Sequence, residues 1–417
     1  MSTIDPVFRI IPTTQNYDWG KKGSDSKVAE FASGARIPGF TFNESAPYAE
    51  LWMGTHVKSP SGVVDKEQNL AQILAMNPSL IGDSVSRRFD TTNGNLPFLF
   101  KVLAIGKALS IQTHPDKKTS EQLHAQQPKV YTDPNHKPEM ALALTDFKAL
   151  CGFMLIPRIA EYVKDVPEFN ALIDPSTVTE FLNCTHSSEL EQKAVLKKFF
   201  SELMTADVTK IATQLQTLVA RYRSGGQKRV EEGIKDLVLT LNEQYPGDVG
   251  VFCAFMLNYV RMTPGQAIFL GAGEPHAYVQ GDIMECMANS DNVIRAGLTP
   301  KPKDIPNLVS VLTYMASDWD KHMVKPVDIT PRTRKYDPPI PDFTVLQVHT
   351  PKGETESHEA IQGPSIAIAT EGSGRVSWGG GDLDLQAGSV IFVGAETKID
   401  ITAGDSNLVV YRAYVTA

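Results

Sequence analysis

The sequence predicts a mainly β protein with two jelly-roll β-barrels and an α-helical domain inserted into the first barrel. Three observations lead to this fold class. Short apolar runs between turn residues fill both ends of the chain, the hydrophobic spacing becomes helical between residues 156 and 260, and a glycine-framed segment at 264–276 recurs at 387–399. A chain of 417 residues is long enough for two or three domains.

The first barrel is predicted to use residues 1–155 together with residues 261–335. Leu96–Ile105 is a short apolar run between turn residues, as expected of a buried strand, and Lys107–Pro115 is predicted to follow it as a second strand. Glu67–Met76 has the spacing of a short amphipathic helix. The first part of the chain therefore reads as mainly β with some helix.

Residues 156–260 are predicted to form the inserted helical domain. Ser188 and Glu191 have the spacing of a capping box at the start of a helix. Three apolar stripes at helical spacing are predicted to form its core. The stripes are Leu190, Ala194, Val195, Phe199 and Leu203; Ile211, Leu215, Leu218, Val219 and Tyr222; and Ile234, Leu237, Val238 and Leu241. Because the domain interrupts the first barrel, we expect an insertion rather than an appended domain.

The proline-rich passage Tyr336–Phe343 is predicted to be a linker at the start of a second barrel, which covers residues 336–417. The remainder alternates β-branched and apolar residues with Gly and Asp turns, as in an all-β domain of short strands. Its segment 387–399 aligns without gaps with 264–276, but Ile399 takes the position of a histidine. We therefore expect a second barrel that kept the turn and the strand but lost that histidine.

Two glycine-led segments carry side chains of the types that bind metals. Gln112 and His114 follow Gly106 and stand two apart, so on a strand both point to the same face. His276 ends the second segment, and Glu139 lies in a proline-bounded turn between them. This is the layout by which a cupin-type barrel holds one divalent metal, with Gln112 in place of the usual first histidine. Two imidazoles, one carboxylate and one amide oxygen suit zinc with a position left open for substrate. The second barrel has no equivalent ligands and is predicted to be a degenerate cupin-type barrel.

A dense run of polar side chains follows His276. It contains Tyr278, Glu285, Asp291, Asn292, Arg295 and Lys301. Such groups beside a metal are what a small polar ligand requires, although composition alone would also fit an ordinary surface loop. Arg295 and Lys301 could bind a phosphate through charge-assisted hydrogen bonds, and Ser110 should share the face of Gln112.

The remaining histidines are predicted to have no part in the metal site. His136 lies close to Glu139 in the sequence, but we expect it to be a neighbour rather than a ligand. The others, which no glycine frame surrounds, are His56, His124, His186, His322, His349 and His358.

Charge and cysteine content argue against several classes of protein. A net charge of −8 gives no electrostatic support for nucleic-acid binding. No Walker-type or dinucleotide glycine loop occurs. The four cysteines are widely spaced without a CxxC pair, which fits a reduced, intracellular protein. The N-terminus lacks the features of a signal peptide and no stretch approaches transmembrane length, so we expect a cytoplasmic protein without a membrane partner.

Long stretches of the chain resemble type I phosphomannose isomerases. The motifs are QNYDWG, YAELWMGTHVKSPS, LPFLFKVLAIGKALSIQTHPDK, DPNHKPEMALALTDFKALCGF and GAGEPHAYVQGDIMECMANSDNVIRAGLTPKPKD. The sizeable helical insertion makes the eukaryotic, fungal-like form the nearest. The resemblance implies one Zn²⁺ per chain held by Gln112, His114, Glu139 and His276, and it implies that Arg295 is an active-site residue.

The resemblance also implies a reaction. The enzyme would interconvert mannose 6-phosphate and fructose 6-phosphate and so supply mannose 6-phosphate for GDP-mannose synthesis and glycosylation. Such an aldose–ketose isomerase moves a proton between C1 and C2 through an enediol, so it needs a base that reaches the carbon. We expect a small sugar phosphate as the partner and a monomeric chain.

The base has four candidates in the sequence, namely Glu285, Asp291, Lys101 and Lys137. We favour Glu285, with Arg295 stabilising the oxyanion or fixing the substrate, and keep Lys101 with Asp291 as the alternative proton-transfer pair. The phosphate is expected away from the metal, where its binding energy positions the reacting end. The expected substrate-binding residues are Ser110, Lys137, Tyr278 and Lys301.

Two other classes of function remain open at this point. A cupin-type iron dioxygenase would need a redox metal, typically with more histidine ligands, and Gln112 argues against it. A non-catalytic protein that binds a metal or a sugar phosphate is the other alternative, because the second barrel indicates that a barrel without ligands can exist in this chain.

Overall fold

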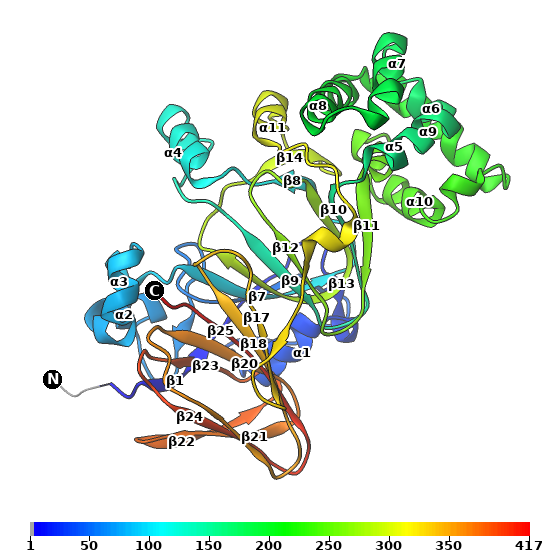
Figure 1. Cartoon of the computed structure of the whole chain (residues 1–417). Coiled ribbons are helices and arrows are strands. Elements are labelled where there is room, and N and C mark those ends of the chain that lie inside the picture. Colours follow the sequence, from blue (N-terminus) through cyan, green and yellow to red (C-terminus); the bar gives the residue numbers. More distant parts are fainter. Residues whose placement is uncertain (1–3) are drawn as a thin grey trace.

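In the computed structural model, which describes residues 4–417, three bodies lie in a row (Figure 1). The helices α5 to α10 lie at one end, the first barrel lies in the middle, and the second barrel lies at the other end. The predicted fold class is confirmed: the chain is mainly β, with two cupin-type barrels and an inserted helical domain.

The first barrel is built from one branched 11-stranded sheet. Its main branch follows the order β15 (Met323–Val324), β12 (Ala267–Leu270), β9 (Glu139–Ala143), β13 (His276–Ala288), β7 (Phe98–Ile105), β5 (Glu50–Met53) and β2 (Thr13–Gln15). Its second branch contains β11 (Leu257–Met262), β10 (Phe147–Phe153), the first part of β13, β8 (Ile111–Thr113) and β14 (Ile294–Gly297). The strand predicted at Lys107–Pro115 is therefore confirmed as β8, which is shorter than the predicted range.

Strand β13 joins the two branches. Its first residues pair with β10 and β8, and from Gly281 onward it pairs with β7 and β9. Gly281 lies where the strand passes between branches, and its φ is +121°, a conformation that strongly favours glycine. A Cβ at this position would lie 2.5 Å from the carbonyl oxygen of Asp146. This glycine therefore allows one strand to carry both His276 and Glu285.

The chain leaves the first barrel after β10, forms the helical domain and returns to the barrel at β11. Because β10 and β11 pair with each other, the helical domain is confirmed as an insertion. Its helices are α5 (Ile156–Asp165), α6 (Pro167–Asn170), α7 (Pro175–Asn183), α8 (Glu189–Thr205), α9 (Val208–Arg223) and α10 (Lys235–Gln244). Ser188 caps α8 by accepting a hydrogen bond from the backbone N–H of Glu191. The two later stripes, from Ile211 and from Ile234, are buried as predicted.

Two details of this region differ from the prediction. Leu190 is 81% exposed and Ala194 is exposed as well, so the assignment of both residues to the core was wrong. Leu190 lies in the first turn of α8, before the helix reaches the core, and Ala194 lies on the exposed face of the same helix. Strand β11 begins at Leu257, inside the stretch predicted to be helical, because its residues pair with β10.

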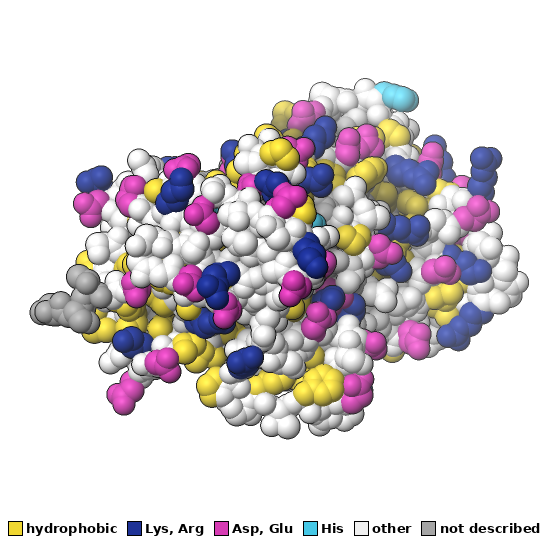
Figure 2. Space-filling model, turned by 90° about the horizontal axis from the view of Figure 1, so that it is seen from below, with side chains coloured by type: hydrophobic (Ala, Val, Ile, Leu, Met, Phe, Trp, Pro, Cys, Tyr) yellow, Lys and Arg dark blue, Asp and Glu magenta, His cyan; other side chains and the backbone are white. Residues whose placement is uncertain are grey.

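The other helices surround the first barrel. They are α1 (Lys27–Gly34), α2 (Leu70–Met76), α3 (Asp83–Arg88), α4 (Lys117–Gln126) and α11 (Ile305–Val311). Helix α2 confirms the predicted helix at Glu67–Met76. Among the described residues 4–417, none of the helices combines the length and apolar character that a membrane crossing requires. On the face in Figure 2, acidic and basic side chains are interspersed.

The second barrel consists of two sheets. The larger has the order β16 (Val327–Asp328), β17 (Thr333–Tyr336), β18 (Thr344–Thr350), β25 (Leu408–Tyr414), β20 (Ser365–Glu371), β23 (Val390–Val393), β1 (Val7–Ile11) and β6 (Gly62–Val63). The smaller has the order β19 (Thr355–His358), β24 (Ile399–Ala403), β21 (Ser373–Trp378) and β22 (Gly381–Gln386). Strand β1 pairs with β23, so the two ends of the chain share a sheet.

The internal repeat seen in the sequence has the same local structure in both barrels. Gly265 and Gly388 adopt left-handed turns with φ values of +86° and +89°. The strands after the turns begin at equivalent residues, as do the strands that start at His276 and Ile399. In the second barrel Ile399 is buried in an apolar core, which leaves no metal ligand at the equivalent position.

The two barrels pack sheet against sheet. Phe98, Phe100 and Val102 of β7 face a core shared with Ile366 and Phe392 of the second barrel. The alternate residues of β7, including Lys101 and Leu103, face the interior of the first barrel. Both faces of β7 are thus covered, which explains why all its residues are buried.

A polar group lies inside the second barrel. His358 Nδ1 lies 3.2 Å from Nη1 of the buried Arg412, and His358 Nε2 lies 3.2 Å from Thr333 Oγ1. A guanidinium can only donate, so His358 Nδ1 accepts and the ring is neutral. Burial lowers the pKa of His358 to about 4, and the nearby Arg412 acts in the same direction.

Replacing Gly281 with alanine should destabilise the fold. The Gly281→Ala change combines a left-handed backbone with a Cβ in contact with a carbonyl oxygen, so we expect a loss of about 2–4 kcal/mol in the free energy of unfolding. Urea unfolding measures this loss. Gly379→Ala, where no atom would lie within 4 Å of the new Cβ, is the control and should change little. Equal stability of both variants would contradict the role assigned to Gly281.

The buried neutral His358 should make stability depend on pH. Because its folded pKa is below the unfolded value, the unfolded chain takes up a proton first, so stability is lost as pH falls from about 6.5 towards 4. Between pH 7 and 5 this single group should contribute about 2 kcal/mol. Urea unfolding at both values should give a smaller difference for His358→Gln than for the wild type. Equal differences would contradict the prediction.

Candidate metal centre and active site

Three buried side chains converge at one point inside the first barrel. His114 follows β8, Glu139 begins β9 and His276 begins β13. One nitrogen or oxygen atom from each lies within 4.8 Å of the others, so the three side chains could together hold a metal ion. The sequence prediction brought these same residues together across a gap that contains the entire helical domain.

The distances fit ligands of one ion better than hydrogen bonds. Glu139 Oε1 lies 3.4 Å from His114 Nε2, and Glu139 Oε2 lies 3.3 Å from His276 Nε2. These are longer than good hydrogen bonds, but roughly the 3.4 Å edge expected between tetrahedral zinc ligands at about 2.1 Å. Both Nε2 atoms and Glu139 Oε2 are buried without a hydrogen-bond partner in the described chain. Three such atoms facing one another fit a cation between them.

The other nitrogen of each imidazole fixes its orientation. His114 Nδ1 lies 2.6 Å from the carbonyl oxygen of Asn292, and His276 Nδ1 lies 3.0 Å from that of Glu274. A carbonyl can only accept, so each Nδ1 carries the proton and each Nε2 presents a lone pair. Hydrogen-bonded rings of this kind are the usual support of metal-binding histidines.

The protonation states also suit a metal. Burial lowers the pKa of His114 to about 4, opposed by Glu139, so the imidazole stays neutral near pH 7. Burial alone would raise the pKa of Glu139, but His114 and Lys137 hold it well below its usual value. Lys137 Nζ lies 3.3 Å from Glu139 Oε1. A neutral imidazole and an ionised carboxylate are the forms that bind metals.

A row of side chains continues from the metal ligands across the second branch. Gln112 lies directly opposite His276 in the β8–β13 pair, and Arg295 lies directly opposite Gln112 in the β8–β14 pair. Residues that face each other across a strand pair share a face, so all three line the same side. Arg295 is partly buried, and its side chain makes no hydrogen bond or ion pair with the described residues. A guanidinium left free beside a metal centre is suited to an anionic ligand.

The main branch contributes a buried charged group. Glu285 pairs directly with Lys101, and Lys101 Nζ lies 3.2 Å from Glu285 and 3.4 Å from Glu50. Burial raises the pKa of Glu285, although Lys101 opposes this. Burial would lower the pKa of Lys101, but Glu50 and Glu285 raise it above its ordinary value. Glu285 is therefore a carboxylate with increased basicity, and Lys101 stays charged.

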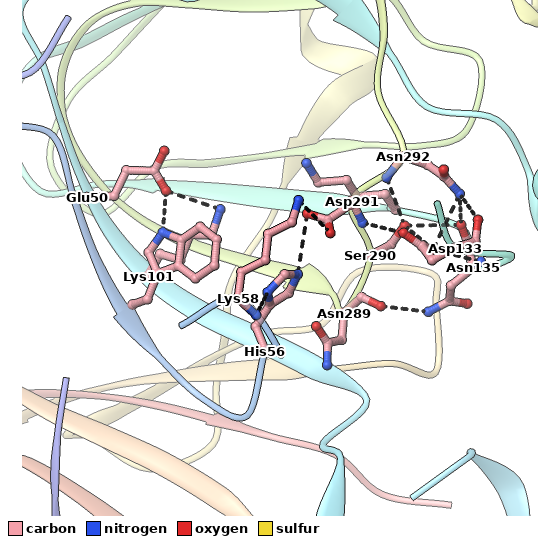
Figure 3. A network of polar contacts seen from close by, with 12 residues as sticks. Glu50, His56, Lys58, Lys101, Asp133, Asn135, Asn289, Ser290, Asp291 and Asn292 are labelled. Carbon is pink, nitrogen blue, oxygen red and sulfur yellow. Dashed lines mark hydrogen bonds and ion pairs between the residues drawn. The ribbon is translucent and has the colours of Figure 1, made fainter. Parts of the chain in front are cut away.

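Asp291 lies in a separate network on the loop after β13 (Figure 3). Its carboxylate is 3.4 Å from His56 Nε2 and 2.9 Å from Lys58 Nζ. Hydrogen bonding to His56 holds the pKa of Asp291 well below its usual value, with Lys58 acting in the same direction. Asp291 is therefore ionised and a weak base. The neighbouring Asn292 is the residue whose carbonyl contacts His114.

The remaining predicted residues differ in how closely they approach the centre. Lys137 contacts Glu139, and Tyr278 is buried in the barrel interior, where burial and then Glu285 raise its pKa well above the usual value. Ser110 is partly buried just before β8. Lys301 is exposed, and the described chain shows no contact between its side chain and the metal ligands.

Five residues near the site were not singled out from the sequence. Glu50 accepts a hydrogen bond from the indole of Trp52, whose ring lies 4.9 Å from Lys101 Nζ. His56 and Lys58 hold Asp291, and Tyr17 lies close enough to Glu50 for that carboxylate, after burial, to raise its pKa. All five lie in the motifs QNYDWG and YAELWMGTHVKSPS, which have no metal-binding pattern to mark them.

Comparison with known families settles the kind of protein. Three models match: phosphomannose isomerase type I, catalytic domain, over residues 7–155; its helical insertion domain over 172–257; and its C-terminal part over 336–381. The mannose-6-phosphate isomerase of Cryptococcus neoformans var. neoformans is 46% identical, with 99% of each chain covered. The chain belongs to the type I phosphomannose isomerase family.

Further members of the phosphomannose isomerase family are similar over nearly the whole chain. The mannose-6-phosphate isomerase of Saccharomyces cerevisiae is 42% identical, with 98% of each chain covered. Two solved structures, the apo form of mannose 6-phosphate isomerase from Salmonella typhimurium and a zinc-bound mannose 6-phosphate isomerase, are 30% and 31% identical. Both have TM-scores of 0.83 and cover 99% of this chain and 100% of theirs. The chain is therefore an isomerase, and neither the dioxygenase nor the non-catalytic alternative is supported.

Removal of a predicted ligand should remove bound metal. His276→Ala should lower the metal content measured by elemental analysis from about one divalent ion per chain to well below that, because one of the buried donors is lost. His186→Gln, on an exposed histidine of the helical domain, is the control and should keep its metal. Full metal content in the His276 variant would show that the ion binds elsewhere.

Proposed function

We propose that this chain is a zinc-dependent aldose–ketose isomerase that interconverts mannose 6-phosphate and fructose 6-phosphate by proton transfer through an enediol. The observation that carries the proposal is the buried group of His114, Glu139 and His276, in which three atoms able to bind a metal have no hydrogen-bond partner within residues 4–417. The names of the relatives and the zinc in a similar structure support the same substrate and metal.

The proposed zinc site takes one ion per chain and uses Gln112 as its fourth protein ligand. Gln112 faces the same side as His276, so its amide oxygen can complete the set. When bound, zinc would polarise the oxygens at C1 and C2 of the sugar and stabilise negative charge that develops there. The roles of the protein residues follow from their positions around this centre.

Arg295 is proposed to bind an anionic oxygen of the substrate. Its guanidinium is partly buried, makes no hydrogen bond or ion pair with the described residues, and lies on the same side as the proposed ligand Gln112. It would stabilise the oxyanion or fix the substrate through charge-assisted hydrogen bonds. The phosphate is proposed to lie on the far side of the sugar, with Ser110, Lys137, Tyr278 and Lys301 as the substrate-binding residues. In that arrangement, phosphate binding positions C1 and C2 at the metal.

Glu285 is proposed to be the base that moves the proton between C1 and C2. It lies two residues before Met287, which pairs directly with Glu139, so Glu285 faces the barrel interior next to a metal ligand. Burial raises its pKa, which increases its strength as a base towards a carbon acid. Lys101 holds the carboxylate in place and remains charged throughout.

The alternative pair, Lys101 with Asp291, is less favoured by its electrostatics. A catalytic base works best with a pKa near the working pH. The pKa of Lys101 is raised above its ordinary value and that of Asp291 is held well below it, so both move away from neutrality. These two residues are proposed to position the substrate and its charged groups rather than to exchange the proton.

The cellular role follows from the reaction. We propose that the enzyme works as a monomer in the cytoplasm and supplies mannose 6-phosphate for GDP-mannose synthesis and glycosylation. The four cysteines, all buried and free of disulfides in the described chain, fit a reducing compartment.

The base assignment can be tested with Glu285→Gln, which keeps the shape of the side chain but cannot accept the proton. We expect kcat with mannose 6-phosphate to fall about 100-fold or more, with little change in zinc content. Exchange of the C2 proton with deuterated water, followed by NMR, should be lost in parallel.

Two comparisons make the test specific. Asp291→Asn should reduce turnover less than Glu285→Gln and keep the proton exchange, whereas the reverse order would favour the alternative pair. Glu189→Gln, an exposed substitution on the helical domain, controls for the loss of a carboxylate and should have full activity. If the wild-type protein converts neither sugar phosphate, the proposed reaction itself is wrong.

A further inference from the structure

One loop connects the metal centre with the charged group around Asp291. This loop, residues 289–293, links β13 to β14. The carbonyl oxygen of Asn292 accepts the hydrogen bond from His114 Nδ1, and the adjacent Asp291 contacts His56 and Lys58 (Figure 3). A shift of this loop would therefore move both the support of a metal ligand and a carboxylate of the site.

Asp133 holds the loop from behind. It lies between α4 and β9. Its Oδ2 accepts a hydrogen bond from the backbone N–H of Asp291 at 2.7 Å, and its Oδ1 accepts one from the hydroxyl of Ser290 at 2.9 Å. Its backbone carbonyl accepts a third from the side-chain amide of Asn292 at 2.8 Å. Asp133 thus bonds to three consecutive residues of the loop.

The surroundings make these bonds difficult to replace. Ser290 and Asn292 are 4% and 2% exposed, so water does not easily substitute for a lost partner there. The amide of Asn292 also donates to the carbonyl of Asn135 at 2.7 Å, which ties the loop to the same segment as Asp133. Three bonds and a buried setting therefore fix the position of the Asn292 carbonyl that faces His114.

We infer that Asp133 is a positioning residue for the metal centre. It makes no contact with the metal ligands, but it holds the carbonyl that keeps the proton on His114 Nδ1 and directs Nε2 at the ion. The inference rests on the zinc site proposed above and adds a residue outside it. Because it acts through the loop, Asp133 also fixes where Asp291 stands relative to Lys58.

Zinc affinity tests this role without relying on turnover. Asp133→Ala should weaken zinc binding about 10-fold, because the Asn292 carbonyl remains but is held less firmly against His114; direct removal of such a partner typically costs about 10- to 100-fold. Metal-free protein is titrated with zinc in competition with a chromophoric chelator. The absorption spectrum of the cobalt-substituted protein should change as well, since it reports ligand geometry. Asp133→Asn keeps one acceptor oxygen and should lose less affinity than Asp133→Ala.

A matched control separates positioning from a general loss of charge. Asp90 lines the same cavity of about 590 Å³ as Asp133, and within the described chain its carboxylate accepts a hydrogen bond only from the nearby Thr92. Asp90→Ala should keep the zinc affinity and cobalt spectrum of the wild type. Should Asp133→Ala fail to fold, Ser290→Ala, which removes one of the three bonds, is measured together with Asp133→Asn.

The outcomes are distinct. The inference would be overturned if both Asp133 variants kept a zinc affinity within about twofold of the wild type and an unchanged cobalt spectrum. If Asp133→Ala does not fold, the same result in Asp133→Asn and Ser290→Ala would overturn it. Either result would leave the proposed zinc site intact. A wild-type protein that binds no zinc would overturn the proposed metal site, and the positioning role with it. Reduced affinity in Asp90→Ala as well would also overturn the role, because the effect would then come from charge alone.

Discussion

The carboxylate of Glu139, held between two imidazole nitrogens, is the constraint on which the site depends. Both nitrogens present lone pairs, because their rings donate to backbone carbonyls on the other side. Without a cation, three buried acceptors would face one another with no donor among them, which costs free energy. The fold tolerates this arrangement because strands from two branches of one sheet hold it rigidly, and a metal ion would satisfy all three atoms.

Strand β13 connects the metal with the proposed base. It supplies His276 to the second branch and Glu285 to the main branch, and Gly281 lets it pass between them. The charges on the main branch are balanced locally, since Lys101 lies between Glu50 and Glu285. Arg295 has no such partner among the described residues, so its positive charge is available for the anionic substrate proposed above.

The sequence predicted the metal ligands because their types and spacings are unusual, whereas it missed residues whose charge and hydrogen-bond contacts form only in the folded chain. His114 and His276 lie in glycine frames, but Glu50, His56 and Asp133 have ordinary neighbours, and only the folded chain brings them to the site. Local patterns also predicted the helical stripes, except at Leu190 and Ala194, where spacing alone cannot tell an exposed helix position from a buried one. The pairing of β1 with β23 joins segments far apart in the chain, and no local pattern specifies it.

The second barrel has a structural role that needs no metal: it covers an apolar face of the first barrel. Strand β7 carries Lys101 on one face and Phe98, Phe100 and Val102 on the other, so the sheet that bears Lys101 and the proposed base has a large apolar outer face. The larger sheet of the second barrel covers that face, and strand β1 ties the start of the chain into the same sheet. Burial of both faces excludes water from behind Lys101 and Glu285, and this burial is what raises the pKa of Glu285. The barrel that lost its ligands thereby contributes to the basicity of the residue proposed to move the proton.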